Sequence, residues 1–198
     1  MKNRISHALY KDGIISKKEI EIVDFGIESM VGTFFSLFIT LIIGVYFDLT
    51  VEGVMFYFFS LPLRKNAGGY HAETKIRCCV FSILVVFLIF LFFSYGNITI
   101  SYYIIISVIL IGIIFLLAPV ENPKKHLDIL EQKVYMKRTR TILIIEGSIL
   151  LIGYLNDWKK LILAICMSFT VCSLNLILGI VKNKIFKRYH ANQENNIL

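Results

Sequence analysis

Long apolar runs alternate with short polar segments along the whole chain. A helix needs about 20 mostly apolar residues to cross a hydrocarbon core of about 30 Å, and most of these runs approach that length. The second and fifth runs are shorter, so the pattern predicts about six membrane-spanning helices, with four as the smaller alternative. The runs are residues 25–47, 51–63, 79–95, 98–120, 141–155 and 161–181.

Composition supports this interpretation, because 57% of the residues are hydrophobic and the mean hydropathy is +0.71. Soluble domains are usually about 45–50% apolar. The expected fold is therefore all-α: a polytopic integral membrane protein with one domain covering residues 1–198. Residues 1–24 are polar and mixed in charge, and no secretory signal peptide is visible there. They favour an amphipathic helix in the membrane interface or a short solvated arm.

Basic residues are distributed asymmetrically between the apolar runs. If the amino terminus is cytoplasmic and there are six spans, 19 of the 21 Lys and Arg residues lie on the cytoplasmic side. The positive-inside rule therefore predicts that both termini are cytoplasmic. The net charge of +7 is explained mainly by these anchoring residues and does not indicate a nucleic-acid partner. The cytoplasmic segments are residues 1–24, 64–78, 121–140 and 182–198.

The polar segment RKNAGGYHAETKIRCC, residues 64–79, contains the main candidate chemistry. Cysteine is nucleophilic as its thiolate, and an ordinary thiol with a pKa of about 8.5 needs a base or a positive environment at neutral pH. His71 can act as that base for Cys78. A helix that begins near Glu73 would add the positive end of its dipole.

Spacing places a condition on this dyad. On one straight helix, seven residues separate His71 and Cys78 by about 10.5 Å along the axis. A nucleophile and its base need to be about 2.6–3.2 Å apart, so the chain must bend between them or His71 must fold back from a preceding turn. Gly68 and Gly69 can support such a bend, because glycine adopts positive φ without steric cost.

Other interpretations of the segment compete with the dyad. It can be a basic interfacial loop followed by two small residues that open a helix. Zinc binding by His71, Cys78 and Cys79 is less favoured, since a fourth ligand is missing, so we expect no metal and no cofactor. Cys79 is the alternative nucleophile. Cys166 and Cys172 lie in the last apolar run, where a small hydrophobic role is expected.

Arg64, the run Gly68-Gly69-Tyr70-His71-Ala72 and Cys78 together resemble the signature of the accessory gene regulator B (AgrB-like) family. The resemblance implies a multi-pass cysteine endopeptidase of the Gram-positive cell membrane that matures quorum-sensing peptides. Its substrate would be an AgrD-like propeptide with an acidic carboxy-terminal tail. Cys78 would displace that tail and form a thioester, with His71 as the general base, and an internal thiol or hydroxyl would then close a thiolactone or lactone.

Five further residues are candidate supporting or substrate-binding groups. Arg64 either orients substrate or marks the cytoplasmic boundary, and Glu73 either orients His71 or is a solvated acid. Lys124 and Lys125 either bind the propeptide or anchor the chain at the membrane. Glu146 lies inside an apolar run, where an ionisable group is a functional candidate by default, although it can also serve helix packing.

Two functions from other classes remain open at this stage. One is a non-enzymatic membrane peptide exporter or scaffold, in which His71 and Cys78 are incidental. The other is a thiol acyltransferase that uses the same dyad on a lipid. The expected partners are the propeptide and the lipid bilayer, and the sequence leaves the identity of the propeptide and the formation of a homodimer open.

Overall fold

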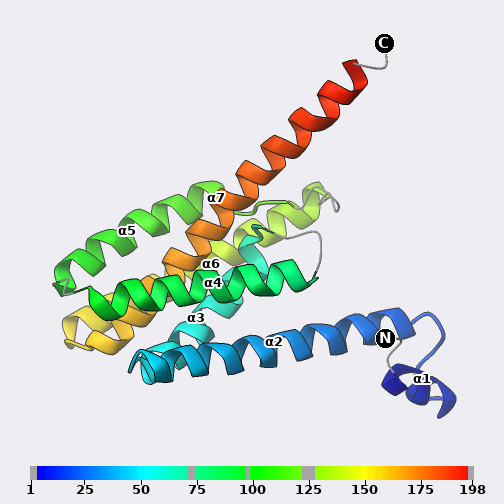
Figure 1. The fold of residues 1–198 in the computed structure, drawn as a ribbon, viewed down its shortest axis with the longest axis horizontal. Helices are drawn as coiled ribbons and strands as arrows, with labels where there is room; N and C mark the ends of the chain where they lie inside the picture. The colour runs from blue at the N-terminus through cyan, green and yellow to red at the C-terminus, as the bar shows by residue number, and fades with distance from the viewer. Residues whose placement is uncertain (1–3, 71–74, 97–98, 122–127, 196–198) are drawn as a thin grey trace. The chain divides into compact units, whose positions relative to one another are not determined.

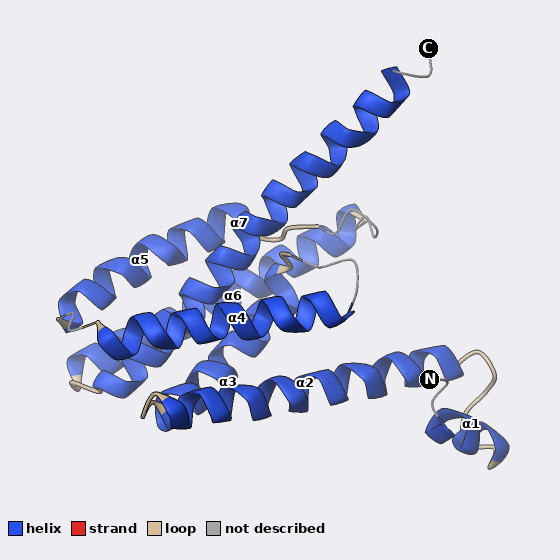
Figure 2. Ribbon diagram, in the orientation of Figure 1, coloured by secondary structure: helices blue, strands red, loops and turns tan. Residues whose placement is uncertain are grey.

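The computed structural model describes residues 4–70, 75–96, 99–121 and 128–195. In these ranges the regular structure is helical, apart from one isolated bridge between Gly68 and Val120 (Figure 2). The expectation of an all-α protein is confirmed. The helices are α1 (Arg4–Lys11), α2 (Ile20–Tyr46), α3 (Thr50–Ala67), α4 (Lys75–Tyr95), α5 (Ile100–Leu117), α6 (Ile129–Leu155) and α7 (Lys159–Asn195).

The chain forms two compact units, residues 1–39 and residues 40–198. The first contains α1 and most of α2, and the choice between an interfacial helix and a solvated arm for the amino-terminal segment stays open. Before α2 the backbone N–H of Ser16 donates to Glu19 Oε2 at 2.7 Å, within the turn that precedes this helix. The second unit contains the helix bundle and all the described candidate residues.

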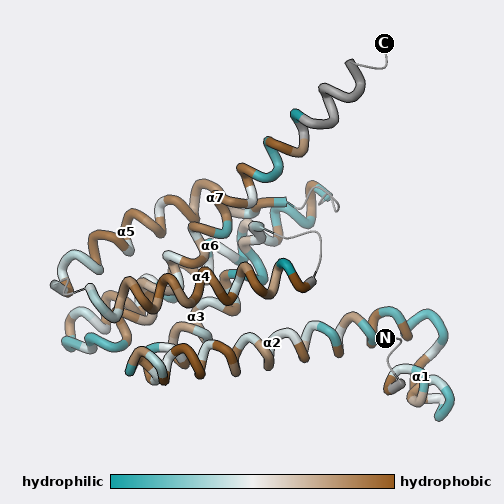
Figure 3. Tube along the Cα trace, viewed as in Figure 1, coloured by the Kyte–Doolittle hydropathy of each residue, from teal (hydrophilic) through white to brown (hydrophobic). Residues whose placement is uncertain are grey.

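Within the described ranges, four helices are long and apolar enough to cross a membrane: α2, α4, α5 and residues 159–186 of α7 (Figure 3). This number matches the smaller of the two predicted counts. The short apolar runs 51–63 and 141–155 lie within α3 and α6. The six-span arrangement and the cytoplasmic termini therefore remain predictions.

Helix α7 is the central element of the second unit and packs most extensively against α3 and α5 (Figure 1). In its apolar window 61% of the residues are buried, against 17–22% in the other three membrane-length helices. Ala164, Ile165, Met167 and Phe169 are fully buried. The first half of α7 thus forms the core, whereas the other apolar helices direct many large hydrophobic side chains outward.

The loops that were expected at residues 64–78 and 121–140 are shorter in the structure, because helices extend into both segments. Helix α3 continues through Arg64 to Ala67, and α4 begins at Lys75. Helix α6 begins at Ile129, after Asp128, whose backbone N–H donates to Glu131 Oε2 at 3.3 Å. The hydrophobicity pattern could not place these helix ends, because the added turns are polar.

One of the two lysines outside the predicted cytoplasmic segments has a local partner. Lys160 Nζ lies 3.9 Å from Glu52 Oε1 and joins the start of α7 to the start of α3. The Glu52 side chain is 8% exposed and the Lys160 side chain 65% exposed. This contact gives Lys160 a structural reason to depart from the charge pattern.

Candidate active site

The two glycines after α3 adopt the backbone conformation that the sequence predicted. Gly68 has φ of 72° and Gly69 has φ of 126°, values that residues with a side chain rarely adopt. The chain therefore turns at Gly68 and Gly69, directly after α3 ends at Ala67 and before α4 begins at Lys75. The bend expected between His71 and Cys78 includes residues 71–74, which lie outside the described residues, so it stays a prediction.

Close backbone packing is a second reason for these glycines. Gly68 forms the bridge with Val120, and the Val120 N–H donates to the Ala67 carbonyl at 3.0 Å. A Cβ on Gly69 would lie 3.0 Å from the Asn175 carbonyl oxygen, closer than such contacts normally come. The glycine pair thus fits between the segment after α5 and the middle of α7.

Gly179 on α7 lies against the main chain of Gly69 and Tyr70. A Cβ there would lie 2.8 Å from the carbonyl carbon of Gly69. Neither Gly179 nor Val120 carries a signal in the sequence that would connect it with the glycine pair. Their role depends on contacts between residues far apart in the chain.

Tyr70 is fixed by three contacts. Its N–H donates to the Asn175 carbonyl at 2.9 Å, and its ring lies 4.7 Å from the ring of Phe81 on α4. Lys182 Nζ from α7 lies 5.3 Å from the centre of the Tyr70 ring, within the range of a cation–π contact. Tyr70 therefore connects the bend to both α4 and α7.

Cys78 lies in the first turn of α4 and is half-buried, as is Cys79. Phe81 and Ser82 follow Cys78 by three and four residues, so they are its neighbours on the same helix face. The first turn of a helix also concentrates unpaired backbone N–H groups and the positive end of the dipole. Cys78 is therefore close to the positive end of the α4 dipole.

Arg64 reaches the same face of α4. Its Nη2 atom lies 3.4 Å from Ser82 Oγ, a long hydrogen bond between α3 and α4. A guanidinium here adds positive charge one turn from Cys78. Arg64 thus supports the candidate site from α3, and its position is compatible with binding an anionic group.

His71, Glu73, Lys124 and Lys125 lie outside the described residues. The separation of His71 from Cys78 therefore stays a prediction, as do the roles of the other three.

Glu146 lies in the interior of the bundle and is 3% exposed. Its Oε2 atom has no hydrogen-bond partner among the described residues. Helix α6 packs against α3, α5 and α7, so this buried carboxyl group belongs to the packed core, where its role remains a prediction.

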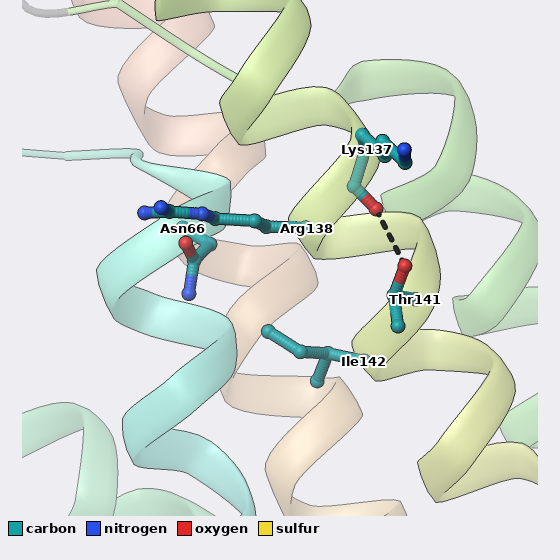
Figure 4. A pocket seen from close by; sticks show the side chains of 5 residues that line it. All are labelled: Asn66, Lys137, Arg138, Thr141 and Ile142. Atoms are coloured by element: carbon teal, nitrogen blue, oxygen red, sulfur yellow. Dashed lines mark hydrogen bonds between the residues drawn. The ribbon is translucent and has the colours of Figure 1, made fainter.

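A basic hollow of about 380 Å³ lies between the end of α3 and α6 (Figure 4). Lys137 and Arg138 contribute cations, and Arg138 extends from α6 toward Asn66. The Thr141 hydroxyl donates to the Lys137 carbonyl at 3.0 Å, the dashed line in the figure. Lys137 and Arg138 were expected only as members of a basic loop, and the helical start at Ile129 brings them to one hollow.

No group of three or more His, Cys, Asp or Glu side chains that could hold a metal ion occurs within the described ranges. The described part of the site therefore consists of a thiol at the start of a helix, flanking aromatic residues and basic groups.

These features define a class: an all-helical protein with membrane-length apolar helices and a cysteine at the start of one of them. The sequence matches the family model of accessory gene regulator B over residues 2–180, and the chain belongs to this AgrB family.

Individual relatives share between 24% and 29% of aligned residues with this chain. The chain is 29% identical to an AgrB-like protein of Clostridium perfringens strain SM101 over 87% of this chain and 82% of that protein. It is 29% identical to AgrB-like protein 2 of Clostridium perfringens strain 13, covering 70% of this chain and 71% of the relative. With the accessory gene regulator protein B of Staphylococcus aureus strain JH9, identity is 24% over 65% of this chain and 70% of the relative. No solved structure matches significantly.

Proposed function

We propose that this chain is a multi-pass cell-membrane cysteine endopeptidase that cleaves and cyclises an AgrD-like propeptide. Membership of the AgrB family supports a role in the accessory gene regulator system. The observation that carries the catalytic assignment is the position of Tyr70, which precedes His71 and packs on Phe81, one turn after Cys78.

In the proposed reaction His71 accepts the proton of the Cys78 thiol. The thiolate attacks the carbonyl carbon before the propeptide tail, the C–N bond breaks, and His71 returns the proton to the amine of the leaving tail. A thiol or hydroxyl of the peptide then loses its proton to His71 and attacks the thioester. Ring closure expels the Cys78 thiolate, which recovers the proton. No oxidant or cofactor is needed.

Positive charge supports recognition of the acidic tail. Arg64 is beside the proposed nucleophile, and Lys137 and Arg138 line the neighbouring hollow. Lys124 and Lys125 extend the basic region in sequence. Since screening grows with ionic strength, we expect salt to weaken binding of the propeptide. In this scheme Glu73 orients His71, and Glu146 supports the fold from the core.

The test is cleavage of an AgrD-like propeptide in membranes that contain the wild type, Cys78→Ala, Cys79→Ala or His71→Ala at matched expression. We expect Cys78→Ala and His71→Ala to lose cleavage and Cys79→Ala to retain it. Loss in Cys79→Ala alone would move the nucleophile by one residue. Cleavage by all three variants would contradict the enzyme and favour the exporter or scaffold.

A second experiment traps the thioester intermediate and distinguishes a peptidase from an acyltransferase that acts on lipids. A propeptide labelled before its tail should become covalently attached to wild-type protein and be released by hydroxylamine, because that reagent cleaves thioesters. His71→Ala serves as the matched control that retains the thiol. Labelling by a fatty-acyl donor in place of the propeptide would contradict the proposal and favour an acyltransferase.

A further inference from the structure

An apolar groove with a volume of about 310 Å³ runs between α5 and α6, and none of the residues that line the hollow of Figure 4 contributes to it. Ile111 and Phe115 line it from α5, and Arg140, Gly147 and Leu151 line it from α6. The groove lies wholly within the second unit. It is separate from Cys78 and from the residues that hold Tyr70.

One end of the groove is cationic. The guanidinium carbon of Arg140 lies 4.3 Å from the centre of the Phe115 ring. A guanidinium that stacks on a ring keeps its N–H donors in its own plane, where they can meet a phosphate. Arg140 is the last basic residue of α6, so everything along the groove beyond it is uncharged at the surface.

The length of the groove matches one membrane leaflet. Arg140 and Leu151 are eleven residues apart on α6. This spacing corresponds to about 16 Å at 1.5 Å per residue. Half of a hydrocarbon core of about 30 Å is about 15 Å. If α6 crosses the bilayer, as the six-span prediction has it, a lipid chain that starts at Arg140 follows the groove to about the bilayer centre.

Gly147 keeps the middle of the groove open. The nearest atom to a Cβ built at this position is Ile111 Cδ1 at 3.7 Å, an ordinary contact distance. A larger side chain at Gly147 would therefore extend into the groove without first displacing backbone.

The groove also offers few hydrogen-bond partners for a peptide backbone. Ser148 is its other polar residue, and the Ser148 hydroxyl already donates to the Ile144 carbonyl at 2.8 Å. A polypeptide at this depth needs partners for its backbone groups, whereas an acyl chain needs none. An acyl chain therefore suits this lining better than an extended peptide.

We propose that the α5–α6 groove binds one anionic phospholipid, with its phosphate on Arg140 and an acyl chain along Gly147 to Leu151. Basic pockets between membrane helices are known to bind such headgroups. Binding does not depend on the peptidase proposal, because it requires neither Cys78 nor a propeptide.

The experiment uses full-length protein in phosphatidylcholine vesicles. The vesicles contain a trace of one photoactivatable probe lipid, either phosphatidylglycerol or phosphatidylcholine. Both probes carry the photoreactive group on an acyl chain. Cross-linked peptides are identified by mass spectrometry. The variants are Arg140→Gln and Gly147→Leu. Their matched controls are Arg138→Gln, the same charge change on another face of α6, and Gly112→Leu, the same added bulk at an exposed α5 position with open space around it.

In the wild type we expect phosphatidylglycerol to label α5 and α6 more strongly than phosphatidylcholine. Arg140→Gln should reduce this preference about tenfold, because a hydrogen bond to a charged group is lost. Gly147→Leu should reduce labelling of the groove by both lipids, and the two controls should retain the wild-type pattern.

Equal labelling by both lipids in the wild type would overturn the proposal, as would loss of labelling in Gly112→Leu to the same extent as in Gly147→Leu. A synthetic propeptide that displaced the lipid and itself cross-linked to Gly147 would also overturn it and identify a peptide groove. Each variant is first checked for a monodisperse profile in detergent, and Arg140→Gln tests the headgroup contact independently if Gly147→Leu fails this check.

Discussion

The Tyr70 N–H donates to the carbonyl oxygen of Asn175 at 2.9 Å, in the middle of α7. This carbonyl can be approached from the side because Gly179, one turn later, has no side chain: a Cβ there would lie 3.0 Å from the Tyr70 nitrogen. The residue before His71 is thus attached to the most buried of the four membrane-length helices that the structure describes.

The first prediction concerns this close approach. Gly179→Ala should lower stability, because the new methyl overlaps Gly69 and overpacking typically costs about 1–3 kcal/mol. Gly112→Ala is the matched control, since nothing lies within 4 Å of its Cβ position and alanine favours a helix by about 1 kcal/mol. Thermal unfolding in detergent should rank Gly112→Ala at or above the wild type and Gly179→Ala below it. The same midpoint for both variants would contradict the contact.

A second prediction separates the ring of Tyr70 from its backbone. Tyr70→Leu should reduce the rate of propeptide cleavage by about three- to tenfold, because it removes a ring pair worth about 0.5–1.5 kcal/mol. Tyr70→Phe keeps the ring and should cleave normally. We expect kcat to fall with little change in KM, because Tyr70 positions His71 in the proposed mechanism. Tyr102→Leu, at an exposed tyrosine, is the control, and an equal loss in that variant would argue against positioning.

Thiol labelling tests where the cysteines lie. Cys78 and Cys79 are half-buried, whereas Cys166 and Cys172 are buried in α7. A maleimide should therefore label two of the four thiols rapidly in the folded protein and all four after denaturation in SDS. Cys78→Ala should leave one rapid site, and Cys78→Ala/Cys79→Ala should leave none. Rapid labelling in this double variant would show that the interior of the bundle is open.

The Glu52–Lys160 pair, at the starts of α3 and α7, gives a prediction about the stability of the fold. Lys160→Met leaves the buried Glu52 carboxylate without its cation, so it should destabilise the fold more than Lys159→Met. Glu52→Gln should relieve part of this cost. Because Lys160 is 65% exposed, a double-mutant cycle should give a coupling of at most about 1 kcal/mol. Indistinguishable unfolding midpoints for Lys159→Met and Lys160→Met would refute the role of the pair.

The pattern of long apolar runs was sufficient to predict the helical class and the approximate position of each large helix. It located the helix ends less well, because the first turns of α6 and the last turns of α7 are polar. Helix α6 starts at Ile129 although its apolar run starts at 141. Local capping by Asp128 and Glu131 is visible in the sequence and could have moved this boundary.

The candidate site was predictable only in part. The glycine bend follows from residue chemistry, and both positive φ values agree with it. The contacts of Tyr70 with Asn175 and Phe81 could not be predicted from one sequence, because they join the segment after α3 to α7 and α4 and leave no periodic signal. The same is true of the Arg64–Ser82 contact.

The bridge between Gly68 and Val120 has a consequence for how such a site can diversify. Val120 contributes main-chain atoms to Gly68 and Ala67, and Asn175 contributes its carbonyl to Tyr70. Main-chain N–H and C=O groups are the same in every residue except proline, which lacks the N–H. Side chains around this junction can therefore change while the framework beneath them keeps its geometry, provided that the glycines remain.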